Sequence, residues 1–255
     1  MSKNPTIVIV HGAWHRPPMY DGLVSIFKSA SYDAVVPALP SCNSPDPATA
    51  TCQKDTDVVR DAILILLDEG KDVLVVAHSY GGIPAGGAAK GLGKGQRKKE
   101  GKKGGVIGMV YVSAFVVPEN VGLLTVMGGK HAPYVIENQP SEHNALTADP
   151  RHNFFNGLSD SEADPLVNQL RPQSLVALDS PAPAAAWADS EFAGRLGFLK
   201  LMNDKALPPL FQDRFTEKSG VAWEVRDVEA GHSSFLGKPG EVVQMIGEWA
   251  EKWKD

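Results

Sequence analysis

The hydrophobic pattern of the chain alternates between short apolar runs and longer amphipathic stretches. Six runs are typical of strands, and in most of them the apolar residues are nearly continuous, as in strands buried on both faces. They are residues 6–10, 34–36, 73–76, 106–112, 196–202 and 221–228. Between them, apolar residues recur at helical spacing in 20–30, 57–67, 83–92, 208–216 and 241–253. Strands that alternate with helices predict a parallel sheet with helices on both faces.

The predicted fold class is therefore α/β, with a doubly wound, six-stranded parallel sheet in the strand order 2-1-3-4-5-6. In this order the first and third strands are neighbours, and their connections leave them in opposite directions. Clefts form at the carboxyl ends of strands at such a switch point. Residues 11–13 follow the first strand and Ser79 follows the third. We therefore expect a functional site where these two segments meet.

One stretch breaks the alternation. Residues 115–194 are rich in proline and aromatic residues, and roughly 80 residues without a strand pattern are too many for a loop. We expect a mostly helical lid here, with helices at 160–170 and 183–192, inserted in a core made of 1–114 and 195–255. Residues 93–105 are rich in Gly and Lys. Their glycine spacing favours a solvated, mobile connection over a surface for an anionic partner.

Composition and charge narrow the classes of function. The 255 residues are 43% hydrophobic and 22% charged, which is ordinary for one large globular domain. A net charge of −5 disfavours general nucleic-acid binding. No signal peptide or membrane span is visible, so we expect a cytoplasmic protein that does not act at a membrane. It is expected to be a monomer or a homodimer.

The two cysteines, Cys42 and Cys52, lie in one loop region. In a reducing compartment free thiols are favoured, and a disulfide across the loop is the alternative. Without a nearby pair of histidines the two thiols do not make a zinc site.

The third strand ends in a serine ringed by small residues, Ala77-His78-Ser79-Tyr80-Gly81, and a helix rich in Ala and Gly follows. A strand, a sharp turn with serine at its tip, and a helix form a nucleophile elbow. The residues two before and two after the serine are crowded in such a turn and must be small. Ser79 is therefore the predicted nucleophile; the alternative is a surface serine at a strand–helix junction.

A serine nucleophile needs a base, and the base needs a carboxylate. His232 follows the last strand and is the predicted base. Asp204 follows the fifth strand, which gives the chain order Ser, Asp, His expected for α/β hydrolases. Asp227 is the rival acid, although it lies within a strand. The backbone N–H groups of Ala13 and Tyr80 form the predicted oxyanion hole.

Four motifs together resemble those of one family. Residues 10–15, Val-His-Gly-Ala-Trp-His, resemble the first-strand motif of the α/β-hydrolase superfamily, in its branch of small methylesterases and hydroxynitrile lyases. Residues 77–82 are similar to the elbow of that branch, 204–212 to its acid loop with a Phe-Gln pair, and 231–233 to its histidine loop. The resemblance covers nearly the whole chain. The departures are Ala77 in place of glycine, the Arg-Pro-Pro at 16–18, and the basic connection at 93–105.

The resemblance implies a serine hydrolase that cleaves a small or medium carboxylic ester or lactone through an acyl-enzyme, without a metal or organic cofactor. The residues expected to line the substrate pocket are Gly12, Trp14, His15, Phe115, Phe155 and Trp187.

The fold leaves two alternatives open, because function is decided by the site. One is a lyase or cyclase on the same scaffold, and the other is a ligand-binding protein that keeps the site for recognition. The hydroxynitrile lyases of the branch carry Thr and Lys where this chain has Gly12 and Ser233, which favours hydrolysis. Lys238 is near enough in sequence to fold back towards the site.

Overall fold

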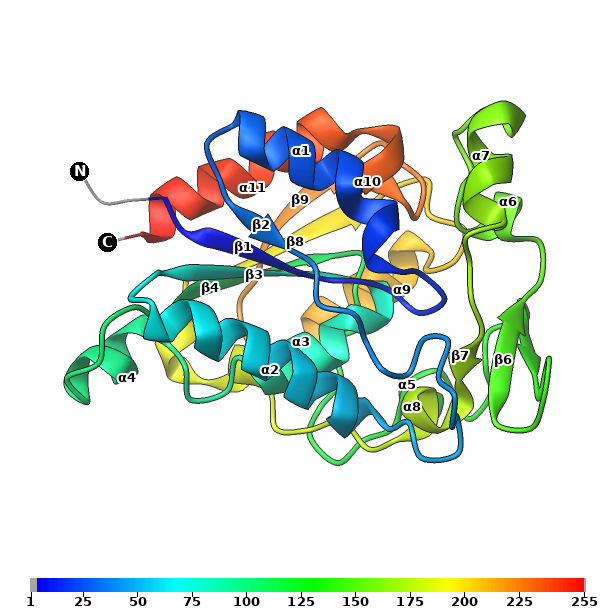
Figure 1. The fold of residues 1–255 in the computed structure, drawn as a ribbon, viewed down its shortest axis with the longest axis horizontal. Coiled ribbons are helices and arrows are strands. Elements are labelled where there is room, and N and C mark those ends of the chain that lie inside the picture. The colour runs from blue at the N-terminus through cyan, green and yellow to red at the C-terminus, as the bar shows by residue number, and fades with distance from the viewer. Residues whose placement is uncertain (1–3, 255) are drawn as a thin grey trace.

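The computed structural model describes residues 4–254. Six parallel strands form its central sheet, as Figure 1 shows: β1 (Thr6–Val10), β2 (Ala34–Val35), β3 (Val73–His78), β4 (Val106–Val112), β8 (Leu196–Leu201) and β9 (Glu224–Val228). Their order across the sheet is β2-β1-β3-β4-β8-β9. The predicted six-stranded parallel sheet and its strand order are confirmed.

Helices cover both faces of this sheet (Figure 1). On one face α1 (Asp21–Ser29) packs against α11 (Pro239–Trp253), and on the other α2 (Cys52–Asp68) packs against α3 (Gly82–Ala88). The strands β1, β3 and β4 are buried at every position, which explains their uninterrupted apolar sequences. The core also contains η1 (Pro17–Tyr20), η2 (Ser79–Gly81), α4 (Lys94–Lys99), α9 (Pro209–Lys218) and α10 (Ser234–Gly237). Within residues 4–254 no helix has the length and apolar character needed to cross a membrane.

The segment 115–194 is less helical than predicted. Its helical elements are α5 (Leu123–Val126), α6 (Pro150–Asn153), α7 (Asp160–Val167), α8 (Leu175–Asp179), η3 (Ala186–Ala188) and η4 (Ser190–Phe192). It also contains a three-stranded sheet, antiparallel, of β5 (Val135–Glu137), β6 (Asn144–Thr147) and β7 (Gln173–Ser174). The helix expected at 160–170 is present as α7. Residues 183–192 form only the two 3₁₀ turns, because extended backbone at Ala185 and Asp189 interrupts them.

The small sheet and the helices α6 and α7 lie beyond the carboxyl ends of the central strands (Figure 1). This end of the sheet is where β1 and β3 finish side by side, with Val10 in register with Ala77. The segment 115–194 therefore stands over the position expected for the functional site.

The basic connection at 93–105 is folded, which corrects the expectation of a mobile loop. It contains α4 (Lys94–Lys99), and Arg97 is buried, with its guanidinium donating to the carbonyl oxygens of Lys103 and Gly104. A Cβ at Gly105 would lie 2.2 Å from the Cα of Lys94. Here glycine permits close packing of the backbone and does not confer mobility.

Cys42 and Cys52 are free thiols, as the sequence favoured. Burial raises the pKa of each thiol to about 12. Both therefore stay protonated at neutral pH and have low reactivity.

Candidate active site

Ser79 lies on a strained turn between β3 and α3. Its φ angle of 54° is in the left-handed region, which is unfavourable for a residue with a side chain. Two glycines let this turn pack tightly. A Cβ at Gly81 would lie 2.3 Å from the carbonyl oxygen of Val10, and a Cβ at Gly82 would lie 2.3 Å from that of Phe115. The local geometry is that of the predicted nucleophile elbow.

The structure brings Ser79, His232 and Asp204 together in one hydrogen-bonded chain. The Nε2 atom of His232 lies 3.0 Å from Ser79 Oγ, and its Nδ1 atom lies 2.7 Å from Asp204 Oδ2. All three residues are buried. Because a carboxylate can only accept, we assign the imidazole proton to Nδ1, which leaves Nε2 free to accept the serine proton. The arrangement can therefore act as a base for Ser79.

Four hydrogen bonds hold the Asp204 carboxylate. Oδ2 accepts from Ser113 Oγ at 2.6 Å as well as from His232, and Oδ1 accepts from the N–H groups of Ala206 at 2.8 Å and Leu207 at 2.7 Å. Burying a carboxylate is costly unless such donors surround it. Ser113 was not among the residues predicted from the sequence. It could have been found as a polar residue directly after β4, because the carboxyl end of β4 lies beside that of β8, which Asp204 follows.

Gln212 ties the acid loop to the strand that precedes it. Its side-chain oxygen accepts from the N–H of Leu201 at 2.9 Å, and its nitrogen donates to the carbonyls of Leu201 at 3.1 Å and Leu207 at 2.7 Å. The side chain is wholly buried. These contacts give a physical reason for the glutamine in the acid-loop motif.

The rival acid, Asp227, does not point into this site. It lies on β9 with its side chain 56% exposed, and it pairs with Lys200 at 3.3 Å. Asp204 is the carboxylate that contacts His232.

Two neutral histidines fix the loop that follows β1. His11 Nδ1 lies 2.9 Å from the carbonyl oxygen of Gly12, and His15 Nδ1 lies 2.8 Å from that of Ala13. Burial lowers the pKa of His11 to about 4 and that of His15 to about 3, so both rings are neutral and donate from Nδ1. In a trans peptide the C=O and the next N–H point in opposite directions. Because His11 holds the Gly12 carbonyl, the N–H of Ala13 points in the opposite direction to that carbonyl. Ala13 and Tyr80 both line the cavity beside Ser79.

Behind the nucleophile runs a buried relay that the sequence did not predict. The N–H of Gly12 donates to Tyr20 Oη at 3.3 Å, Tyr20 Oη donates to His78 Nδ1 at 2.8 Å, and His78 Nε2 donates to the His232 carbonyl at 3.0 Å. Burial lowers the pKa of His78 well below its ordinary value, so the ring is neutral and has one donor and one acceptor. The relay connects the loop after β1 to the backbone of His232.

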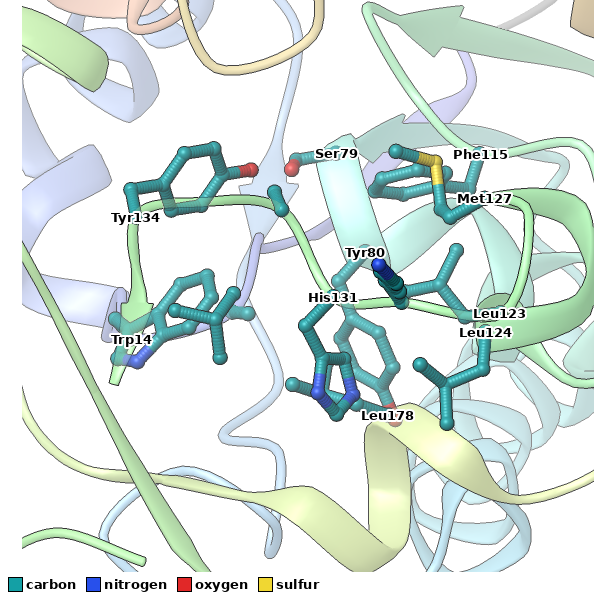
Figure 2. Close-up of a pocket in the computed structure, with 14 residues that line it drawn as sticks. Trp14, Ser79, Tyr80, Phe115, Leu123, Leu124, Met127, His131, Tyr134 and Leu178 are labelled. Carbon is teal, nitrogen blue, oxygen red and sulfur yellow. The ribbon is translucent and has the colours of Figure 1, made fainter. Parts of the chain in front are cut away.

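A cavity of about 40 Å³ adjoins Ser79. Figure 2 shows its walls, which are mostly apolar side chains of the segment 115–194, among them Leu123, Leu124 and Met127. Two of the six pocket residues expected from the sequence, Trp14 and Phe115, line this cavity.

The other four expected pocket residues do not line this cavity, and their place in a substrate pocket stays a prediction. Gly12 faces the relay, since a Cβ there would lie 3.0 Å from His78 Nδ1. His15 and Phe155 pack together in an aromatic cluster, with ring centroids 6.0 Å apart, and Trp187 is buried against α3. The rings of His15 and Trp187 are taken up by core packing, whereas Phe155 lines a separate pocket beside Gly231 and Ser233.

His131 joins two parts of the cavity wall. Its ring nitrogens lie 2.7 Å from the carboxylate of Glu137 and 2.8 Å from that of Asp179. Burial opposes a charge on His131, but the two carboxylates outweigh it and raise the pKa of the ring. Across residues 4–254 no group of three or more His, Cys, Asp or Glu side chains is placed to hold a metal ion.

Comparison with known proteins identifies the family. The model of the alpha/beta hydrolase family matches residues 7–245, so the chain belongs to this family. The alpha/beta hydrolase nvfD of Aspergillus novofumigatus is 31% identical to it over 95% of each chain. The resemblance that the four motifs carried is confirmed.

Solved structures share the fold at low sequence identity. A pyrethroid hydrolase from Sphingobium faniae JZ-2 superposes with a TM-score of 0.75 at 18% identity, covering 97% of both chains. Polyneuridine aldehyde esterase superposes with a TM-score of 0.72 at 19% identity, covering 96% of this chain and 98% of the esterase. These structures share the fold of the chain, whose membership of the hydrolase family rests on the family model.

Proposed function

We propose that the protein is a serine hydrolase that cleaves a carboxylic ester or lactone through an acyl-enzyme. The observation that carries this proposal is the hydrogen-bonded chain from Ser79 through His232 to Asp204, with contacts of 3.0 and 2.7 Å. The elbow geometry of Ser79 and the loop held by His11 and His15 support it. The names of the two solved neighbours, a hydrolase and an esterase, agree with this class.

In the proposed reaction, Ser79 Oγ attacks the carbonyl carbon while His232 Nε2 takes the hydroxyl proton. The N–H groups of Ala13 and Tyr80 stabilise the oxyanion of the tetrahedral intermediate. The bond to the alcohol oxygen then breaks, and His232 returns the proton to that oxygen. Water, deprotonated by the same imidazole, then attacks the acyl carbon; the bond to Ser79 Oγ breaks, His232 returns the proton to Oγ, and the acid is released. Asp204 orients the imidazole and stabilises its positive charge throughout.

The cavity beside Ser79 limits the size of the acyl group. A cavity must have about 10–15 Å³ to hold one water molecule. A cavity of about 40 Å³ therefore fits an acyl chain of only a few heavy atoms. We assign the segment 115–194 the role of a lid, since its side chains form most of the wall. The monomer or homodimer and the cytoplasmic location stay predictions from the sequence.

Two features of the site argue against hydroxynitrile-lyase chemistry. The residue after His232 is Ser233, which carries no charge for a departing cyanide. Lys238 does not fold back into the site, because its ammonium group lies 3.3 Å from Glu241 at the start of α11. Hydrolysis is the reaction that the site supports best.

Replacing Ser79 tests this proposal. The wild-type protein should hydrolyse short methyl and nitrophenyl esters, and an organophosphonate should label Ser79. Ser79→Ala should abolish the labelling and lower kcat by about 10⁶-fold, the scale of loss for a triad serine. Ser25→Ala, at an exposed serine of α1, is the control and should match the wild type.

Four outcomes would overturn the proposal. Labelling at another residue, or full ester hydrolysis by Ser79→Ala, would show that Ser79 is not the nucleophile. Fast cyanide release from mandelonitrile without ester hydrolysis would establish the lyase. No reaction with any ester or with mandelonitrile would favour the ligand-binding protein.

A further inference from the structure

A tyrosine of the segment 115–194 reaches the nucleophile from the opposite wall. Figure 2 shows the Tyr134 hydroxyl pointing towards the Ser79 hydroxyl, and both residues line the same cavity. The Tyr134 carbonyl accepts from the N–H of Ala148 at 2.7 Å, which fixes its backbone at the edge of the small sheet. Its ring packs edge-on against Trp14 and Phe154, with centroids 6.1 and 5.5 Å apart. Backbone and ring are held, and the hydroxyl extends from them towards the site.

The Tyr134 hydroxyl is a partly buried donor with a weak partner. In the described part of the chain its hydrogen bond goes to the Ala206 carbonyl at 3.3 Å, which is long beside the usual value of about 2.8 Å between two oxygens. Burial raises the pKa of Tyr134, and the charge of Asp204 raises it further, so the phenol remains protonated at neutral pH. The Tyr134 hydroxyl can therefore leave the Ala206 carbonyl and donate to a substrate oxygen with little loss of free energy, because the hydrogen bond that it gives up is weak.

Tyr134 also stands between two spaces of very different size. On one side is the cavity of about 40 Å³, and on the other is a groove of about 500 Å³ lined by Lys205, Ala206 and Phe211. The acid-loop residues in the wall of the groove directly follow Asp204, whose carboxylate contacts His232. Since His232 must return its proton to the alcohol, the alcohol portion of an ester belongs on the groove side and the acyl group in the cavity. The alcohol oxygen then lies beside Tyr134.

We propose that Tyr134 is a further catalytic residue, whose hydroxyl donates a hydrogen bond to the alcohol oxygen of the ester as the C–O bond breaks. This role rests on the proposed ester hydrolysis. The phenol keeps its proton; the proton that Ser79 gives to His232 is the one that ends on the alcohol. The hydrogen bond stabilises the negative charge that builds up on the alcohol oxygen before that proton arrives.

The proposed bond has a chemical signature. An alkyl alcohol is a poor leaving group, because its oxygen must bear the developing charge alone. A nitrophenolate spreads the same charge over its ring and gains little from another donor. Tyr134 should therefore matter for alkyl esters and hardly at all for nitrophenyl esters of the same acid.

Tyr134→Phe removes the hydroxyl and keeps the ring in its place. The kcat/KM for methyl and ethyl esters should fall by about 10-fold to 100-fold, the loss of one hydrogen bond to a charged oxygen, and that for the nitrophenyl ester by less than about threefold. A plot of log kcat/KM against the pKa of the leaving alcohol should therefore be steeper for the variant. Tyr32→Phe is the matched control, since its hydroxyl bonds Gly247 and Glu251 on α11, and it should keep the wild-type slope.

A second measurement separates transition-state stabilisation from substrate binding. In the inactive background of Ser79→Ala, adding Tyr134→Phe should leave the dissociation constant of an alkyl ester unchanged, because the charge on the alcohol oxygen develops only during reaction. Weaker binding of the ester by the double variant would overturn the proposal.

Equal losses for alkyl and nitrophenyl esters would also overturn it, as would no loss for either. Failure of the hydrolase assignment itself would look different, because the wild-type protein would then hydrolyse none of the esters.

Discussion

The acid loop and the wall of the cavity meet where Tyr134 contacts Ala206, and they are held in different ways. In the acid loop, Asp204 takes four hydrogen bonds of 2.6 to 2.8 Å and Gln212 makes three more. The wall at residues 123–135 is mostly apolar; its polar side-chain contacts are those of His131 with two exposed carboxylates and one long hydrogen bond from Tyr134. Hydrogen bonds are directional and fix an imidazole to within the small error that catalysis tolerates. Apolar contacts have no direction, which suits a surface that receives substrates of various shapes.

The largest effect should come from the centre of the acid loop. Asp204→Asn should lower kcat by about 10⁴-fold, because the amide favours the wrong tautomer of the imidazole. Steady-state ester hydrolysis measures it. Asp227→Asn is the matched control. Its side chain is exposed on β9, and the variant should retain wild-type activity. If Asp227→Asn were the severe variant, the acid would have been misassigned.

A smaller effect should follow from loosening the same loop. Gln212→Leu leaves the N–H of Leu201 and the carbonyl of Leu207 buried without their partner, while the Leu201 carbonyl keeps the N–H of Asp204 at 3.3 Å. Since each such group costs about 1–3 kcal/mol, the free energy of unfolding in urea should fall by about 3 kcal/mol and kcat should fall with it. Gln244→Leu, which removes an exposed bond to Glu248 on α11, should change stability by less than about 0.5 kcal/mol. A Gln212→Leu enzyme with normal kcat would mean that the acid loop keeps its position without this side chain.

The smallest effect is expected on the wall, where His131 supplies a contact that depends on pH. Its pKa in the folded protein is raised above the ordinary 6.5, so the stabilisation is complete below that value and is lost as pH rises through the folded pKa. His131→Asn should therefore be less stable than the wild type at pH 5.5, by less than about 1 kcal/mol because both carboxylate partners are well exposed. At pH 8.5 the two proteins should unfold at nearly the same urea concentration. An equal difference in the free energy of unfolding at both pH values would show that the charge of His131 does not contribute to stability.

The features that the sequence predicted share a local signature. A strand buried on both faces needs an apolar residue at every position, so β1, β3 and β4 appear as uninterrupted runs and the sheet could be predicted. Ser79, Asp204 and His232 stand just beyond the carboxyl ends of parallel strands, and such ends meet at one edge of the sheet. The residues that the structure brings together could therefore be found from their positions alone.

The features that escaped prediction depend on contacts between distant segments. Tyr20 and His78 are 58 positions apart, and a hydrogen bond across that distance leaves no periodic mark. Ser113 and Tyr134 reach the site only because the chain returns to it. The small sheet was missed because its strands have two to four residues, too few for alternation to be recognised.

The glycines of the elbow also determine how this protein can diverge. A Cβ on Gly81 or Gly82 would stand 2.3 Å from a backbone oxygen of another segment, that of Val10 or of Phe115. Any substitution there must displace the backbone of β1 or of the segment that follows β4, both of which belong to the centre of the fold. Leu124, by contrast, ends in a cavity, so a change in its shape displaces no backbone. Random mutation followed by selection would thus alter the choice of substrate through the wall while the elbow stayed fixed, and a library restricted to the wall would sample new specificities at little risk to folding.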